Sequence, residues 1–169
     1  MLSETGKHGV IPLRVGVISD THGAVKETAR AVQQMGNIDA LIHAGDFYVD
    51  ALFLKSELKV PVYAVAGNCD SPSSGPDELT ITLDGHRVLI THGHLHRVKY
   101  GLQGLVYKAR EVEATTVVFG HTHVPLNLME NNILLFNPGS PVNPMPGHIA
   151  GYGILEIDKQ RIKGRLLSL

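Results

Sequence analysis

The sequence lacks most features that mark secreted, membrane-spanning or nucleic-acid-binding proteins. Its 169 residues include one cysteine, Cys69, so no internal disulfide can form and a reducing compartment is expected. No apolar run approaches the roughly 18 residues that a membrane span needs. Fifteen basic and sixteen acidic residues give a formal net charge of −1, without the basic excess typical of nucleic-acid binders. We therefore expect a cytoplasmic protein without a membrane partner, for which nucleic acid is a disfavoured ligand.

The N-terminal segment also lacks a sorting signal. Residues 1–12, MLSETGKHGVIP, contain no apolar stretch of the kind found in signal peptides, and we interpret them as a flexible tail. The remaining residues, 13–169, have a length that suits a single domain. A chain of this size buries roughly 70% of the surface that its unfolded form exposes. Its hydrophobic content of 43% is ordinary for a globular protein.

Against these absences, histidine is abundant, with ten residues, and several lie in a repeated pattern. Five apolar stretches typical of buried strands each run into aspartate, asparagine or histidine. The stretches are 15–19 before Asp20 and His22, 40–44 before Asp46, 62–66 before Asn68 and Asp70, 88–91 before His92 and His94, and 117–119 before His121 and His123. Open α/β sheets place their sites outside the carboxyl ends of the strands. Because imidazole and carboxylate are common metal ligands, the pattern predicts one metal-binding pocket.

The secondary-structure pattern indicates an α/β fold. Strands at 14–19, 40–44 and 62–66 alternate with helices at 25–35 and 51–58, which favours a parallel sheet. Val25, Ala29, Val32 and Met35 would form the apolar face of the first helix. Further on, hairpins are predicted for 78–91, 126–136 and 152–167, and a helix at 101–113 and a strand at 115–119 lie between the first two. Two packed sheets are the architecture that this order favours.

The polar blocks resemble those of a known family. Asp20-x-His22, Gly45-Asp46, Gly67-Asn68-x-Asp70, His92-Gly93 and Gly120-His121-x-His123 are similar, in this order, to the sequence blocks of calcineurin-like metallophosphoesterases. With Asn137-Pro138-Gly139-Ser140 included, the chain most resembles the small YfcE-type phosphodiesterases from about Arg14 to its end. The resemblance implies an αββα sandwich, with two mixed sheets flanked by helices.

The resemblance also implies a dinuclear metal centre. One ion would be held by Asp20, His22, Asp46 and His123, and the second by Asp46, Asn68, His92 and His121, so that Asp46 bridges the two. The implied reaction is hydrolysis of a small phosphodiester by a metal-bridging hydroxide. Imidazole, carboxylate and amide ligands without thiolate favour Mn²⁺, Ni²⁺, Fe²⁺ or Zn²⁺ over Mg²⁺, and we take Mn²⁺ as the first choice.

Several further residues are candidates for supporting roles. His94 and His96 follow His92 at alternating positions, and each is either a phosphate contact or a solvated loop residue. Asp70 is a candidate for fixing the loop that carries Asn68. Asn137 and Ser140 would either support the ligands or form a turn. His43 interrupts an apolar run, as expected of a hydrogen-bonded core histidine.

Cys69 occupies the position at which many phosphatases of the superfamily have a histidine that protonates the leaving oxygen. A thiol beside two cations is a doubtful general acid, because cations favour the thiolate. The candidates for catalysis are therefore Asp46, Asn68, Cys69, Asp70 and His94.

Two rival functions remain open. A protein-interaction scaffold could keep the fold and lose catalysis, like the retromer subunit that shares it, but a scaffold should have lost ligands and all seven positions are filled here. A nuclease would share the metal centre and would need a basic groove. The proline- and glycine-rich loop 138–151 is either functional or a plain connector. The natural substrate and the formation of a homo-oligomer cannot be inferred from these residues.

Overall fold

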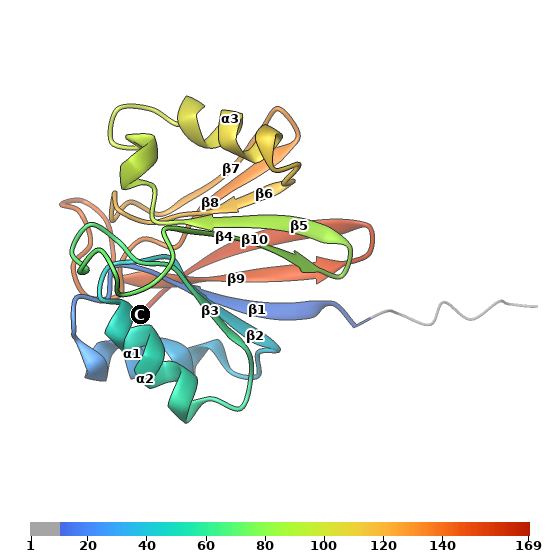
Figure 1. The fold of residues 1–169 in the computed structure, drawn as a ribbon. Coiled ribbons are helices and arrows are strands. Elements are labelled where there is room, and N and C mark those ends of the chain that lie inside the picture. The colour runs from blue at the N-terminus through green and yellow to red at the C-terminus, as the bar shows by residue number, and fades with distance from the viewer. Residues whose placement is uncertain (1–10) are drawn as a thin grey trace, which may run out of the picture.

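The computed structural model describes residues 11–169, so the tail expected at 1–12 lies almost wholly outside the described residues. Two five-stranded sheets face each other, and helices cover their outer surfaces (Figure 1). This arrangement confirms the predicted αββα sandwich. Each sheet contains three adjacent parallel strands, and every hairpin that the sequence predicts is present.

The first sheet has the strand order β10-β9-β1-β2-β3. Its parallel strands are β1 (Leu13–Ile18), β2 (Ala40–His43) and β3 (Val62–Ala64), joined through helices α1 (Val25–Met35) and α2 (Tyr48–Glu57). The hairpin of β9 (Gly151–Asp158) and β10 (Arg161–Ser168) extends this sheet, with β9 antiparallel to β1. The end of the chain thereby pairs with its beginning.

The second sheet has the order β4-β5-β6-β8-β7. Its parallel strands are β5 (His86–Thr91), β6 (Thr116–Val118) and β8 (Ile133–Asn137), and β4 (Glu78–Leu83) and β7 (Leu126–Glu130) form the antiparallel edges. A single-turn 3₁₀ helix, η1 (His94–His96), follows β5, and helix α3 (Gln103–Glu111) precedes β6. The structure therefore contains one short helix, η1, that the sequence did not predict.

The core consists of three apolar layers. Side chains such as Val17, Ile42, Ile90 and Phe136 fill the space between the two sheets. Helices α1 and α2 pack on the outer face of the first sheet, and α3 packs on the outer face of the second through Leu105, Val106 and Ala109. Figure 1 shows α3 above the two sheets and α1 and α2 below them. Because both sheets are covered on both faces, their central strands are buried.

The predicted apolar face of α1 is only partly right: Met35 is buried and Val32 packs against the core, but Val25 and Ala29 do not belong to the buried face. The residues of α1 that are buried are Thr28, Ala31 and Met35, whereas Val25 is 44% exposed and Ala29 is exposed as well. Thr28, Ala31 and Met35 are spaced three and four residues apart, so they lie on one helical face. The prediction failed because it counted Thr28 as polar and therefore placed the stripe on a neighbouring face.

Helix α2 begins three residues before the predicted start. The backbone N–H of Tyr48, in the first turn, donates to the carboxylate of Asp70 at 2.7 Å. The first N–H groups of a helix have no partner within it, and here a side chain from a distant loop supplies one. A cap from 22 residues away leaves no local signal in the sequence.

Within residues 11–169, no helix is long and apolar enough to cross a membrane.

Candidate metal centre

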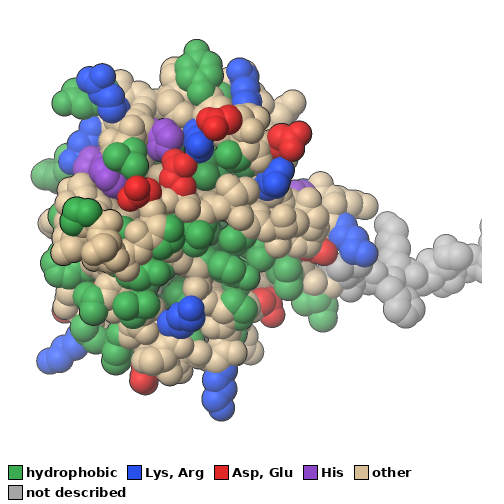
Figure 2. Space-filling view, in the orientation of Figure 1, with side chains coloured by type: hydrophobic (Ala, Val, Ile, Leu, Met, Phe, Trp, Pro, Cys, Tyr) green, Lys and Arg blue, Asp and Glu red, His purple; other side chains and the backbone are tan. Residues whose placement is uncertain are grey.

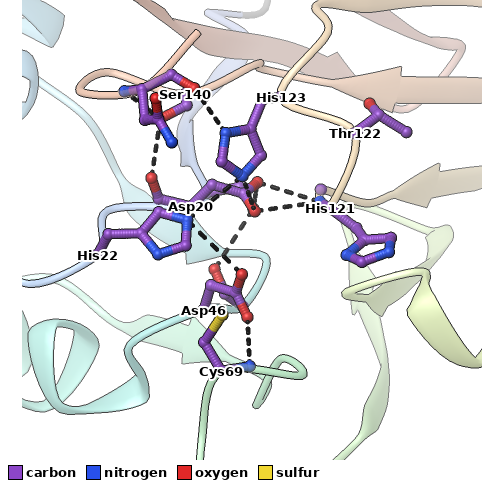
Figure 3. A network of polar contacts seen from close by, with 12 residues as sticks. Asp20, His22, Asp46, Cys69, His121, Thr122, His123 and Ser140 are labelled. Carbon is purple, nitrogen blue, oxygen red and sulfur yellow. Dashed lines mark hydrogen bonds and ion pairs between the residues drawn. The ribbon is translucent and has the colours of Figure 1, made fainter. Parts of the chain in front are cut away.

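The five polar blocks lie at the carboxyl ends of five parallel strands. Asp20, Asp46 and Asn68 follow β1, β2 and β3 of the first sheet, while His92 and the pair His121 and His123 follow β5 and β6 of the second. Asp20 is fully buried and Asp46 is 2% exposed. Figure 3 shows Asp20, His22, Asp46 and His123 lying close together.

Four of the expected ligands form a compact group. Asp20, His22, Asp46 and His123 each offer one ligand atom, and the four atoms lie within 4.8 Å of one another. The Nε2 atoms of His22 and His123 are 3.3 Å apart. His123 Nε2 is 3.2 Å from Asp20 Oδ1, and His22 Nε2 is 3.6 Å from Asp46 Oδ2. This is the group that the resemblance assigns to the first metal ion.

The hydrogen bond of His123 Nδ1 determines which ring nitrogen carries the proton. Nδ1 faces the carbonyl oxygen of Asn143, which can only accept, so Nδ1 carries the proton and donates it. Nε2 is therefore left with a lone pair that points at the Asp20 carboxylate. The hydrogen bond to Asp20 raises the pKa of His123, so a proton can bind Nε2 where a metal ion would otherwise bind.

His92 is arranged in the same way. Its Nδ1 donates to the carbonyl of Ala44 at 2.8 Å, and Nε2 lies 3.2 Å from Asn68 Oδ1 and 3.3 Å from Asp46 Oδ1. Burial opposes protonation of His92, but the hydrogen bond to Asp46 and the negative charges of Asp20 and Asp46 together outweigh it and raise the pKa. Burial likewise opposes ionisation of Asp46, yet the hydrogen bond and charge of His92, together with hydrogen bonds from Cys69, hold its pKa far below the ordinary range. Nε2 of His92, Oδ1 of Asn68 and Oδ1 of Asp46 are thus three electron-pair donors around one position, which favours binding of a cation there.

His121 stands at the edge of this second group. Its ring centroid is 5.1 Å from that of His92, and its backbone N–H donates to the Asp20 carboxylate at 3.1 Å. Burial lowers the pKa of His121 to about 4, and the positive charges of His92 and Lys99 act in the same direction. The ring is therefore neutral at physiological pH, the state in which imidazole binds a metal ion.

The backbone around the ligands is strained. Asp20, His22, Asp46, His121 and His123 all have positive φ, between 47° and 68°. Such conformations cost free energy in residues other than glycine and cluster at functional sites. A Cβ at Gly67 would overlap Asp46 Oδ1, and a Cβ at Gly120 would overlap the side chain of Ser19. These two glycines let the loops approach closely enough to bring the carboxylates together.

Residues outside the ligand group hold its loops in place. Asp70 accepts the N–H of Gly67 at 2.8 Å as well as that of Tyr48, so it ties the Asn68 loop to α2. Asn137 donates to the carbonyl of Gly120 at 3.0 Å, and Ser140 Oγ donates to the carbonyl of Asp20 at 2.8 Å.

Three other candidates of the sequence lie in different settings. His43 is fully buried and bonded to Thr21 at 3.0 Å, as a core histidine should be. His94 is half-buried beside His92, and its buried Nδ1 has no hydrogen-bond partner among the described residues. His96 pairs with Glu78 on β4.

Cys69 is exposed next to the group. Its backbone N–H donates to Asp46 Oδ1 at 3.0 Å, while its Sγ accepts a weak bond from Asn68 Nδ2 at 3.6 Å. Burial of the sulfur and the nearby Asp46 carboxylate raise the pKa of the thiol to about 11. The carbonyls of Ala44 and Asn143 could not be predicted as partners of His92 and His123, since backbone acceptors carry no side-chain signal. Lys99, whose charge acts on His121, was not among the predicted residues either.

Comparisons with known proteins agree with this geometry. The calcineurin-like phosphoesterase superfamily domain matches residues 13–160. The chain is 34% identical over 147 residues to the probable metallophosphoesterase YsnB of Bacillus subtilis, covering 86% of this chain and 85% of that protein. It is 31% identical over 165 residues to the phosphodiesterase YfcE of Escherichia coli, covering 83% and 85%.

A solved structure from Streptococcus pneumoniae, described as a predicted phosphoesterase, superimposes with a TM-score of 0.76 at 32% identity over 94% of this chain and 91% of that one. The family match, residues 13–160, spans most of the described chain and includes every polar block of the site. The protein belongs to the calcineurin-like phosphoesterase superfamily.

Proposed function

We propose that the protein is a dinuclear-metal phosphodiesterase: Asp46 would be shared by two divalent ions, which when bound would supply a hydroxide as nucleophile for the phosphorus. The observation that carries this proposal is the convergence of Asp20, His22, Asp46 and His123 within 4.8 Å. Their donor atoms face one another with lone pairs, an arrangement that is unfavourable unless a cation lies between them. The names of the relatives YsnB and YfcE support the same reaction class.

The charge of the site supports a diester substrate. Two divalent ions bring four positive charges, Asp20 and Asp46 remove two, and the hydroxide removes one. The remaining single positive charge matches the single negative charge of a phosphodiester. His94 is a candidate contact for a phosphate oxygen, because its half-buried ring lies 5.4 Å from that of His92. Asn68 would share the second ion with His92 and His121.

The ligand chemistry supports Mn²⁺, with Ni²⁺, Fe²⁺ and Zn²⁺ as the alternatives, because it combines imidazole, carboxylate and amide without thiolate. We propose a cytoplasmic location on the basis of the single cysteine.

The rival functions have less support. A scaffold without catalysis has no need for strained loops that converge seven ligand positions. On the face seen in Figure 2, basic and acidic side chains are interspersed, which is not the pattern of a basic groove for nucleic acid.

The test is metal removal and reconstitution with bis(p-nitrophenyl) phosphate as substrate. Chelated protein should be inactive, and Mn²⁺ should restore turnover with a ratio of two ions per chain. Full activity in the chelated protein, or no activity with any of the four metals, would contradict the proposal.

A further inference from the structure

An apolar cavity lies beside the metal-binding residues. Its volume is about 420 Å³, and six of its eight lining residues are apolar. These six are Val98, Leu102, Phe119, Val124, Leu126 and Met145. They come from the segment after η1, the start of α3, the end of β6, the start of β7 and the 138–151 loop. Cavities of a few hundred Å³ that are mostly apolar hold small organic groups.

The cavity shares a loop with the metal centre. Thr122, which also lines it, lies between His121 and His123 in the chain, and Val124 follows His123 directly. In Figure 3 the side chain of Thr122 points away from Asp20 and Asp46. Asn137 donates to Thr122 Oγ1 at 3.0 Å and holds it in that orientation. One face of this loop therefore presents metal ligands while the other borders the cavity.

Two residues place the mouth of the cavity next to solvent and to the site. Met145 is 48% exposed, and its backbone N–H donates to the carbonyl of His123 at 3.3 Å. Lys99 is exposed and lines the cavity, and its charge acts on His121. A cation at the mouth of an apolar cavity suits a ligand that carries an anion next to an apolar group.

Resting on the proposed function, we propose that this cavity binds an apolar ester group, aryl or branched alkyl, of the phosphodiester substrate. With the phosphate at the metal centre, the ester group would pass over Thr122 into the space between Leu102, Val124 and Met145. Lys99 would attract the anion from the rim. The substrate class is accordingly a phosphodiester with at least one bulky apolar substituent.

The experiment measures binding with two diesters that are poor substrates, diphenyl phosphate and dimethyl phosphate. Both have one negative charge, and only the first has apolar rings. Zn²⁺-loaded protein with ¹³C-labelled methionine methyl groups reports dissociation constants and contacts together by NMR. We expect diphenyl phosphate to bind roughly tenfold more tightly or better, as burial of an apolar group predicts. Its binding should shift the Met145 methyl signal and leave that of Met129 unchanged.

Matched variants assign the preference to the cavity. Met145→Ser should reduce the preference for diphenyl phosphate several-fold while leaving dimethyl phosphate affinity unchanged. Met129→Ser is the control, because Met129 is an exposed methionine of β7 outside the cavity lining. Lys99→Gln should weaken both diesters by a similar factor, since it removes charge and not apolar surface.

The outcomes separate this inference from the proposed function. Equal affinity for the two diesters, or a preference without a Met145 shift, would overturn the inference even if metal-dependent turnover is present. A preference with the Met145 shift in a protein that turns over no diester would uphold the cavity as a binding site and refute the catalytic proposal.

Discussion

Asp46 divides its two carboxylate oxygens between histidines that follow strands of different sheets. Oδ1 lies 3.3 Å from His92 Nε2, and Oδ2 lies 3.6 Å from His22 Nε2. Because His22 belongs to the first ligand set and His92 to the second, Asp46 is the residue whose geometry suits a shared ligand. The N–H of Cys69 fixes the carboxylate by donating to Oδ1 at 3.0 Å.

This geometry predicts that Asp46→Asn reduces occupancy of both metal positions at once. An amide carries no negative charge, so both ions would lose a charge-neutralising ligand. His22→Ala should mainly empty the first position and therefore serves as the comparison. Metal content per chain, measured after dialysis, distinguishes the two variants. Near-normal occupancy of both positions in Asp46→Asn would remove Asp46 from the bridging role.

Cys69 supports a second prediction at this scale. Its thiol has a pKa of about 11 without metal ions, and bound cations would favour the thiolate, so in neither state is it a well-matched acid near neutral pH. Turnover should therefore fall steeply as the leaving-group pKa of the diester rises. Cys69→Ala should change the rate on nitrophenyl esters little, and Cys69→His should flatten the dependence. A shallow wild-type slope that steepens in Cys69→Ala would show that the thiol does donate.

At the scale of elements, the sequence predicted the strands and the polar residues at their ends better than the helix faces. The strand ends carry Asp20, Asp46 and His92, and alternation of apolar stretches with polar ends is a local signal. The face of α1 and the start of α2 depend on what packs or bonds from elsewhere, here the sheet below Thr28 and the carboxylate of Asp70. Tertiary contacts determine both the buried face of α1 and the start of α2, so no local sequence pattern predicts these two features.

The 138–151 loop, which the sequence left as either functional or a plain connector, contacts the site directly. Ser140 Oγ donates to the Asp20 carbonyl and accepts the N–H of Asn143 at 2.9 Å, and the Asn143 carbonyl accepts from His123 Nδ1. One hydroxyl thus connects a ligand of the first sheet with the partner that orients His123. This chain of contacts connects the loop to the candidate metal centre.

Ser140→Ala should weaken metal binding without unfolding the protein. Loss of such an orienting contact typically costs roughly 10–100-fold in metal affinity. Competition with a metal-binding dye measures the affinity directly. Ser168→Ala, at an exposed position of β10, is the matched control and should bind metal as the wild type does. If both variants bound metal equally well, the loop would be a plain connector after all.

At the scale of the whole molecule, the site joins the two sheets. Of the proposed ligands, Asp20, His22, Asp46 and Asn68 follow strands of the first sheet, and His92, His121 and His123 follow strands of the second. Neither sheet alone therefore holds a complete proposed ligand set. The sequence could place these residues at strand ends, and the resemblance grouped them. The sequence could not predict the hydrogen bonds that orient His92 and His123, because their partners are the backbone carbonyls of Ala44 and Asn143.

The same packing buries a histidine that takes no part in the ligand sets, and this gives the last prediction. Burial lowers the pKa of His43 from its ordinary value of about 6.5 to about 4. In the unfolded chain His43 binds a proton below about pH 6.5, whereas in the folded protein it stays neutral until about pH 4. Its contribution to the free energy of unfolding is therefore complete above pH 6.5 and is lost as the pH falls from 6.5 to 4, by about 3 kcal/mol in all. The pKa of His121 is shifted in the same direction and those of His92 and His123 in the opposite one, so only a variant isolates the effect of His43.

His43→Gln should be less stable than the wild type at pH 7, because it loses the fitted contact with Thr21, and this difference in the free energy of unfolding should shrink steadily down to pH 4. Urea unfolding of both proteins in the presence of a chelator measures this difference at each pH, and a difference that stays constant from pH 7 to 4 would mean that His43 binds its proton equally well in the folded and unfolded chains.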